Sequence, residues 1–141
     1  MSYSIFLNTM ESEECVVSEP KITDKTYAAL DELPLCPVET TLMLISNKWK
    51  ILIIRDLLGG TKRFGELKKS LVGISQKVLT ANLRSLEEFG LVHRQVYAEV
   101  PPRVEYSLTA TGQSLEPVLR AMADWGTIYQ ENFYKEHKKA R

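Results

Sequence analysis

The sequence predicts a mainly α-helical protein with a small β-hairpin, an α+β class, and three observations support this. Apolar residues recur at helical spacing over 48–58 and 75–89. Residues 91–100 and 103–108 alternate as strands do, with Pro101-Pro102 between them. No apolar run reaches the roughly 18 residues needed to cross a bilayer. We therefore expect a globular chain with no membrane segment.

The chain of 141 residues suits one compact domain preceded by an acidic arm. Residues 1–35 carry seven acidic and two basic side chains, whereas residues 36–141 carry eleven acidic and sixteen basic ones. The net charge of zero therefore conceals segments of −5 and +5. We expect residues 1–35 to form a partly ordered arm and residues 36–141 the functional domain. The positive excess lies mostly between Lys48 and Arg103 and favours a polyanionic partner, although an ordinary lysine-rich surface explains the charge alone equally well.

The composition argues against several other classes of protein. The N-terminus lacks the basic segment of a signal peptide, so we expect a cytoplasmic location. Cys15 and Cys36 are too few for a secreted disulfide framework. Together with His93 and His137 they are also too few for a zinc site, so no metal or other cofactor is expected. Because the sequence has no nucleophile elbow, metal-ligand cluster or phosphate-binding glycine loop, we expect no catalytic residues and no enzyme.

The first elements of the chain are expected to be helices. A short helix is expected at 24–31, and another begins at Pro37, a residue favoured at the first helical position. The apolar stripe of this second helix is Leu42, Leu44 and Ile45. A third helix, 48–58, ends at Gly59-Gly60. Its apolar face consists of Trp49, Leu52, Ile53 and Leu57.

A turn joins two helices in the centre of the chain. Residues 62–64 form a short extended link, and a helix over 64–71 follows. The inward residues of this helix are Leu67 and Leu71. Residues 72–74 form a turn, and the helix 75–89 and the hairpin come next. Two helices joined by a short turn and followed by a hairpin form a winged helix-turn-helix. The rest of the chain is helical, with a kink or break expected near Pro117.

The helix over 75–89 has two chemically different faces. Ser75 is a suitable N-cap, with Ile74 and Leu79 at the staple positions around it. At about 100° per residue, the apolar residues occupy one arc of the helix. They are Val78, Leu79, Leu83, Leu86 and Phe89. The opposite face carries Gln76, Lys77, Thr80 and Arg84.

This polar face suits the major groove of DNA. Arg84 or Lys77 can donate to guanine, and Gln76 can pair with adenine. Thr80 can contact a thymine methyl group or a phosphate, and the N–H groups of the first turn, after Ser75, can hold a phosphate. A merely solvated face is the alternative for this helix alone. The order of the neighbouring elements favours DNA binding.

Basic residues around this motif are candidates for further contacts. Arg103, at the tip of the hairpin, and Arg94, at the base of its first strand, are expected to reach a minor groove or the DNA backbone. Solubilising arginines are the alternative. The residues expected to contact phosphates around the first helix of the motif are Lys62, Arg63, Lys68 and Lys69.

Three segments together resemble HxlR-type transcription regulators, which are related to the MarR group. They are CPVETTLMLISNKWKILIIRDLL, KRFGELKKSLVGISQKVLTANLRSLEEFGLVHRQVY and EVPPRVEYSLTATGQSL. The resemblance runs from about Cys36 to Tyr129. It implies a homodimeric, sequence-specific DNA-binding regulator, more often a repressor, with the helix from Ser75 in the major groove and Pro101–Arg103 as the wing. It also implies dimer contacts from the N-terminal and C-terminal helices, and it leaves residues 1–35 without a counterpart.

The C-terminal stretch LEPVLRAMADWGTIYQENFY gives independent support for a second copy of the chain. Its apolar residues repeat at spacings of three and four and must be covered. We expect the chain's own core to cover the part before Gly126 and a dimer partner to cover the part after it. The interface candidates are Leu42, Met122, Trp125, Ile128, Tyr129 and Phe133. A twofold dimer predicts a palindromic site with half-sites roughly 34 Å apart.

Cys36 is the candidate for a response to oxidants or electrophiles. In some HxlR-type proteins a cysteine at the matching position senses quinones, aldehydes or oxidants. A helix N-terminus also favours the thiolate. A buried small hydrophobic residue is the alternative, and Cys15 is a candidate to resolve an oxidised Cys36. For the whole protein, the competing hypothesis is a winged-helix interaction module that does not bind DNA, and no residue pattern specifies a small effector.

Overall fold

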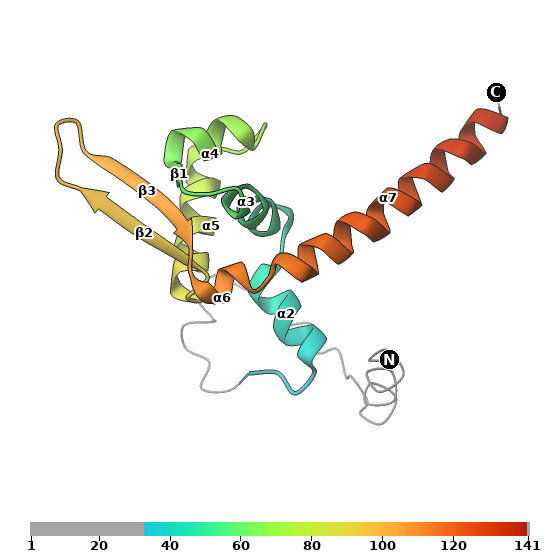
Figure 1. Ribbon diagram of the computed structural model, residues 1–141, viewed down its shortest axis with the longest axis horizontal. Helices are drawn as coiled ribbons and strands as arrows, with labels where there is room; N and C mark the ends of the chain where they lie inside the picture. The colour runs from blue at the N-terminus through green and yellow to red at the C-terminus, as the bar shows by residue number, and fades with distance from the viewer. Residues whose placement is uncertain (1–32, 141) are drawn as a thin grey trace. The chain divides into compact units, whose positions relative to one another are not determined.

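The computed structural model describes residues 33–140, shown as coloured ribbon in Figure 1. The chain divides into two compact units, residues 1–46 and residues 47–141. The helix expected at 24–31 lies outside the described residues, as do Cys15 and most of the predicted arm. None of the helices in the described range has the length and apolar character of a membrane span.

In the first unit, helix α2 runs over Pro37–Ile45 and begins at proline as predicted. The Thr40 N–H donates to the Cys36 carbonyl at 3.0 Å, which closes its first turn. The predicted apolar stripe is partly wrong, because Met43 and Ile45 are buried while Leu42 is 59% exposed. Met43 and Ile45 lie about 200° apart around the helix, so the buried residues of α2 do not form the single stripe that the sequence predicted.

The second unit contains a winged helix-turn-helix, which confirms the predicted fold class. Its helices are α3 (Lys48–Leu58), α4 (Phe64–Ser70), α5 (Gln76–Glu88), α6 (Ala110–Gln113) and α7 (Glu116–Lys139). Its strands are β1 (Lys62–Arg63), β2 (Val92–Tyr97) and β3 (Arg103–Leu108), which form an antiparallel sheet in the order β1-β3-β2. In Figure 1 the β2–β3 hairpin extends away from the helices as the wing.

Helix α3 lies at the centre of this unit and packs against α5, β3 and α4. Its buried residues are Lys50, Ile53, Ile54 and Leu57, which follow the i, i+3, i+4, i+7 spacing of a helix face. The predicted face was therefore partly wrong, since Trp49 and Leu52 are only half-buried. The sequence pattern did not reveal the buried face, because its first position is a lysine, Lys50. The Lys50 stem is buried, and its ammonium lies 5.7 Å from the centre of the Phe89 ring.

Two glycines meet local requirements of the fold. Gly73, in the turn between α4 and α5, has a φ of +91°, a conformation that glycine adopts without strain. At Gly112 in α6, a Cβ atom would overlap the Leu91 carbonyl oxygen. The close approach of α6 to the start of β2 therefore requires a residue without a side chain.

Helix α7 follows the break predicted near Pro117, which lies in its first turn, where proline is tolerated. The helix has 24 residues, and none of them is buried. The expectation that the chain's own core covers the part before Gly126 is therefore only partly right, since Val118 and Leu119 are half-buried but Met122 and Trp125 are 50% and 69% exposed. Only the first turns contact α3, and the C-terminal half of α7 extends away from the rest of its unit (Figure 1).

Candidate nucleic-acid interface

Helix α5 is anchored on one side and open on the other. Ser75 caps it, because its Oγ accepts a hydrogen bond from the Val78 N–H at 3.1 Å. Three leucines are almost completely buried and fix the helix to the body of the unit. They are Leu79 (0% exposed), Leu83 (1%) and Leu86 (0%). This apolar half of the predicted pattern is confirmed, although Val78 stays 37% exposed.

The opposite face brings the predicted groove-contacting residues together. Gln76, Lys77 and Arg84 are exposed, and Thr80 is half-buried. The Thr80 hydroxyl donates to the Gln76 carbonyl at 2.8 Å, so its proton is already used inside the helix. Thr80 therefore offers a methyl group and acceptor lone pairs to a ligand, whereas Gln76, Lys77 and Arg84 offer donors.

An asparagine pair that the sequence analysis missed connects α5 to the start of α3. Asn47 caps α3, its Oδ1 accepting from the N–H groups of Trp49 at 2.9 Å and Lys50 at 3.0 Å. Its Nδ2 donates to Asn82 Oδ1 at 3.0 Å. Asn82, only 8% exposed, in turn donates from Nδ2 to the Val78 carbonyl at 2.8 Å. The pair thus fixes α5 by hydrogen bonds as well as by apolar packing.

Asn47 holds this position in an unusual backbone conformation. Its φ of 92° and ψ of 157° lie in a region that residues other than glycine rarely adopt. The cap on α3 and the bond to Asn82 offset this strain. The sequence does contain a signal for the pair, because Asn82 falls within the apolar arc of α5, where a polar residue needs a partner.

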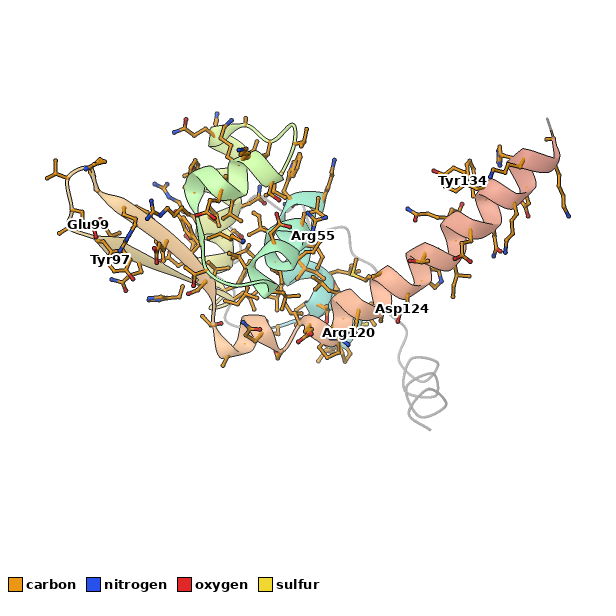
Figure 2. All side chains as sticks on the ribbon, turned by 45° about the horizontal axis from the view of Figure 1, so that its top comes forward. Arg55, Tyr97, Glu99, Arg120, Asp124 and Tyr134 are labelled. Carbon is orange, nitrogen blue, oxygen red and sulfur yellow. The ribbon has the colours of Figure 1, made fainter. Side chains whose placement is uncertain are left out.

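The wing has an internal cluster of charges at its outer end. The guanidinium of Arg103 lies 4.1 Å from the centre of the Tyr97 ring. It also forms ion pairs with Glu99 at 3.3 Å and Glu105 at 3.4 Å, and its side chain is 28% exposed. Figure 2 shows Tyr97 and Glu99 on the outer part of the hairpin. Arg103 is thus held against the wing rather than extended from its tip, and the Pro101-Pro102 turn lies beyond it.

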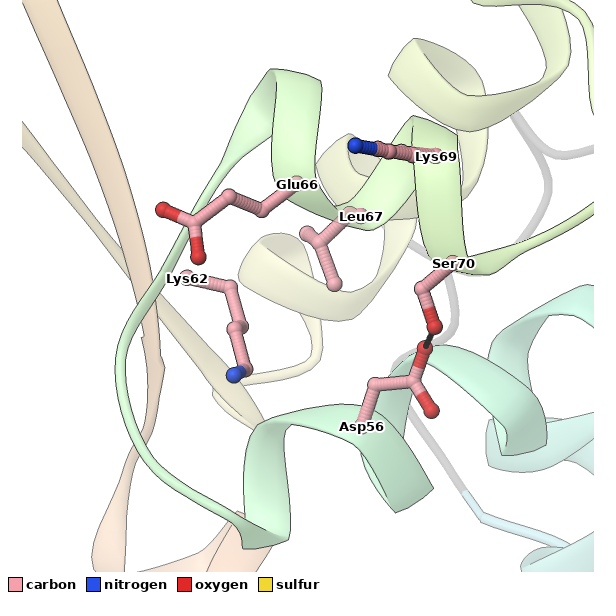
Figure 3. A pocket seen from close by; sticks show the side chains of 6 residues that line it. All are labelled: Asp56, Lys62, Glu66, Leu67, Lys69 and Ser70. Carbon is pink, nitrogen blue, oxygen red and sulfur yellow. Dashed lines mark hydrogen bonds between the residues drawn. The ribbon is translucent and has the colours of Figure 1, made fainter.

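The four basic residues around α4 have different surroundings. Lys62 and Lys69 line a hollow of about 440 Å³ together with the carboxylates Asp56 and Glu66. Figure 3 shows this hollow, in which Ser70 Oγ donates to Asp56 Oδ2 at 2.7 Å. Arg63 and Lys68 are exposed and lie outside its lining. Among the described residues no ion pair engages Lys62 or Lys69, so all four basic residues remain candidates for phosphate contacts.

The residues expected to form a dimer interface share an exposed apolar stripe on α7. Its members are Met122, Trp125, Ile128, Tyr129 and Phe133, between 44% and 69% exposed. The rings of Trp125 and Tyr129 stack, with their centres 5.4 Å apart. Leu42, the remaining candidate, is exposed on α2 in the other unit. The stripe begins at a shallow apolar hollow lined by Pro117, Val118, Ala121, Met122 and Trp125.

Cys36 occupies the N-cap position of α2 and is half-buried. Its backbone is extended, with a φ of −78° and a ψ of 119°. Cys36 therefore lies at the positive end of the α2 dipole, although its side chain makes no capping hydrogen bond. Over the part of the chain that the structure describes, no group of His, Cys, Asp or Glu residues has the arrangement of a metal site.

The helix-turn-helix, its exposed polar face and the wing define a winged helix-turn-helix protein of the transcription-regulator class. Residues 44–134 match the family model described as HxlR-like helix-turn-helix. The chain belongs to this family, which confirms the resemblance seen in its sequence.

Named relatives agree with this assignment. The uncharacterized HTH-type transcriptional regulator YdeP of Bacillus subtilis is 50% identical over 105 residues, which cover 74% of this chain and 82% of YdeP. The redox regulator HypR in its reduced form is 44% identical with a TM-score of 0.67, covering 71% of this chain and 99% of HypR. The reduced form of the regulator YodB from B. subtilis is 40% identical with a TM-score of 0.58, covering 65% of this chain and 91% of YodB.

Proposed function

We propose that the protein is a sequence-specific DNA-binding transcription regulator that acts as a homodimer on palindromic sites. The observation that carries the proposal is the division of α5, whose leucines are buried while Gln76, Lys77 and Arg84 remain exposed. A helix held in this way presents a stable row of donors. Its position as the second helix of a helix-turn-helix is the position that enters a major groove in such proteins.

Contacts with the DNA backbone support the same orientation. Ser75 and the first-turn N–H groups that follow it suit a phosphate at the N-terminus of α5. Arg63 and Lys68 on the helix-turn-helix and Arg94 on β2 add exposed positive charge. Lys62 and Lys69 add further positive charge, whereas Arg103 is paired with two carboxylates and contributes less. Phosphate contacts of this kind set the position of the protein, and base contacts then select the sequence.

The homodimer is proposed from the exposed stripe on α7. Large apolar and aromatic residues that line one side of a helix are stabilised when a second surface covers them. A second copy of the same helix offers a matching stripe across a twofold axis. Two copies of α5 related in this way can occupy successive major grooves, so the operator has inverted half-sites.

A response to oxidants through Cys36 is proposed as the form of regulation, with repression of target promoters as the ordinary state. HypR, a redox regulator, is similar to this chain over most of its length. The position of Cys36 beside a helix N-terminus favours its reactive thiolate. We expect diamide to change the DNA affinity of the wild type and to leave the Cys36→Ser variant unchanged. Equal responses of the two proteins would reject the role of Cys36.

Gel-shift titration with genomic fragments at two salt concentrations tests DNA binding. We expect discrete complexes whose affinity falls steeply between 50 and 200 mM salt, by roughly 10³-fold or more if about six phosphates are contacted. If the protein instead binds only acidic proteins through this face, it would give no discrete DNA complex at either salt concentration. That result would favour the interaction-module hypothesis instead.

A further inference from the structure

A small, partly open hollow lies between α5 and the wing. It has a volume of about 220 Å³ and is lined by Thr80, Arg84, Glu87, Arg94 and Tyr106. This is below the ~300 Å³ at which pockets for whole small molecules begin. The hollow therefore suits one compact charged group rather than a complete metabolite.

Local structure brings the two arginines to this hollow from different elements. On α5, Thr80, Arg84 and Glu87 are spaced at i, i+4 and i+7, so they share a helix face. On the sheet, Arg94 is paired with Tyr106 in the antiparallel register of β2 and β3. Because directly paired residues lie on the same side of a sheet, Arg94 shares the side of the buried Tyr106.

Both arginines are available to a ligand. Among the described residues, no hydrogen bond or ion pair engages the side chain of Arg84 or Arg94, and both are exposed. Arg55, Arg103 and Arg120 differ, because each pairs with a carboxylate. Guanidinium groups bind phosphate oxygens through paired N–H donors, and two of them at one hollow can hold one phosphate from two sides.

We propose that this hollow binds a single phosphodiester group of the DNA strand that passes between the major groove and the wing. The inference rests on the proposed function and deepens it. Arg84 then contacts the backbone rather than guanine, and base reading on α5 falls to Gln76 and Lys77 near its N-terminus. Thr80 supplies a wall rather than a donor, because its hydroxyl proton is used by the Gln76 carbonyl.

Glu87 weakens this site by its charge. It is the one carboxylate among the residues that line the hollow, and it repels a phosphate held by Arg84 and Arg94. Removal of this charge strengthens DNA binding, whereas removal of the adjacent charge of Glu88, which is outside the lining, has a smaller effect. The two residues follow each other on α5, so they provide a matched pair.

A double-mutant cycle tests whether Arg84 and Arg94 hold the same phosphate. We expect Arg84→Gln and Arg94→Gln each to weaken binding about tenfold. Each should reduce the salt slope by about 1.8, the value for one phosphate in each half-site of the dimer. The double variant should lose little more than either single variant, in affinity and in slope, because the phosphate is already lost. Additive losses, with the slope reduced by about 3.6, would overturn the proposal.

Two controls test whether the arginines share one phosphate rather than bind two. Lys77→Gln combined with Arg94→Gln should give additive losses, since Lys77 lies outside the hollow. In the second control, each operator phosphate is replaced in turn by a neutral methylphosphonate. At one position in each half-site the replacement should weaken binding by the wild type. At that position it should not weaken binding by Arg84→Gln or by Arg94→Gln any further. If no such position exists although the wild type binds DNA, this inference fails alone. If the wild type binds no DNA, the proposed function fails.

The matched acidic pair gives an independent measurement. Glu87→Gln should tighten binding several-fold, whereas Glu88→Gln, with the same change in net charge, should alter it clearly less. Equal effects of the two variants would show a response to net charge only and would contradict a phosphate at this hollow. Circular dichroism of each variant verifies that α5 is retained.

Discussion

Helices α5 and α7 are both amphipathic, but the apolar face of α5 is buried and that of α7 is exposed. In α5 the apolar face is covered, with Leu79, Leu83 and Leu86 each no more than 1% exposed. In α7 no residue is buried, although Trp125 and Ile128 are large and apolar. Figure 2 shows Tyr134 in the part of α7 that extends from the body of its unit.

This difference in burial indicates that the two amphipathic helices have different roles. The buried leucines make α5 part of the core, so that its polar face is held in one orientation for a ligand. The apolar stripe of α7 has no such partner within its unit, and its stability depends on a second surface. We therefore assign DNA contact to α5 and association to α7, and each assignment can be broken separately.

The largest expected effect concerns the core side of α5. Leu83→Ala should lower the free energy of unfolding by about 2–5 kcal/mol, because it leaves a cavity in a packed interior. Ile128→Ala on α7 should cost much less in dilute protein, since Ile128 is 60% exposed. Chemical denaturation at a concentration below the dimer dissociation constant measures both. Similar losses for the two variants would mean that α7 is also covered within one chain.

The second prediction concerns association. Ile128→Glu should weaken the dimer at least 100-fold, because it places a charge in an apolar interface. Thr127→Glu adds the same charge outside the apolar stripe and should leave the dimer nearly intact. Sedimentation equilibrium measures the dissociation constants, and circular dichroism verifies that the helix persists. If both variants stay dimeric, the α7 stripe is not the interface.

The third prediction concerns the bond between the two asparagines. Asn82→Ala should cost about 1–3 kcal/mol of stability, because it removes two hydrogen bonds of a buried side chain, one with Asn47 and one with the Val78 carbonyl. Asn47→Ala should cost more than Asn47→Gly, because glycine accepts the φ of 92° and alanine does not. Thermal denaturation ranks the variants. Both variants lack the capping side chain, so the reverse order for alanine and glycine would contradict the argument from backbone strain.

The smallest expected effect is in the wing. Glu99→Gln removes one of the two carboxylates that pair with Arg103. Because this ion pair is partly exposed, the substitution should change the free energy of unfolding by less than about 1 kcal/mol. It should also increase DNA affinity slightly, because Arg103 is then less neutralised. Gel-shift titration and denaturation measure the two quantities. A marked loss of DNA binding would show instead that Glu99 is needed to shape the wing.

Local sequence signals were sufficient for most of the secondary structure. Ser75, Gly73 and Pro101-Pro102 act through the backbone around them, and the elements that they delimit lie where the pattern predicts. Lys50 and Asn82 show where such signals fail, because each is a polar residue on a buried face. Their burial depends on neighbours supplied by other elements, such as Phe89 and Asn47.

The candidate site was likewise predictable in part. The polar face of α5 follows from helical spacing alone. The contacts of Arg103 with Tyr97 and two glutamates depend on strand register and on the path of the hairpin. The sequence pattern specifies neither of these. The convergence of Arg84 and Arg94 also depends on how the hairpin packs against α5. The covering of α7 cannot be obtained from one chain, because the proposed partner is a second copy.

Selection of duplexes from a random pool with the wild type and with Gln76→Ala tests the central claim, that the exposed face of α5 reads DNA, most directly. The wild type should enrich inverted half-sites with centres about 10 base pairs apart. Gln76→Ala should retain that spacing and lose preference at one base in each half-site. Identical preferences for the two proteins, or no enriched sequence for the wild type, would contradict the account.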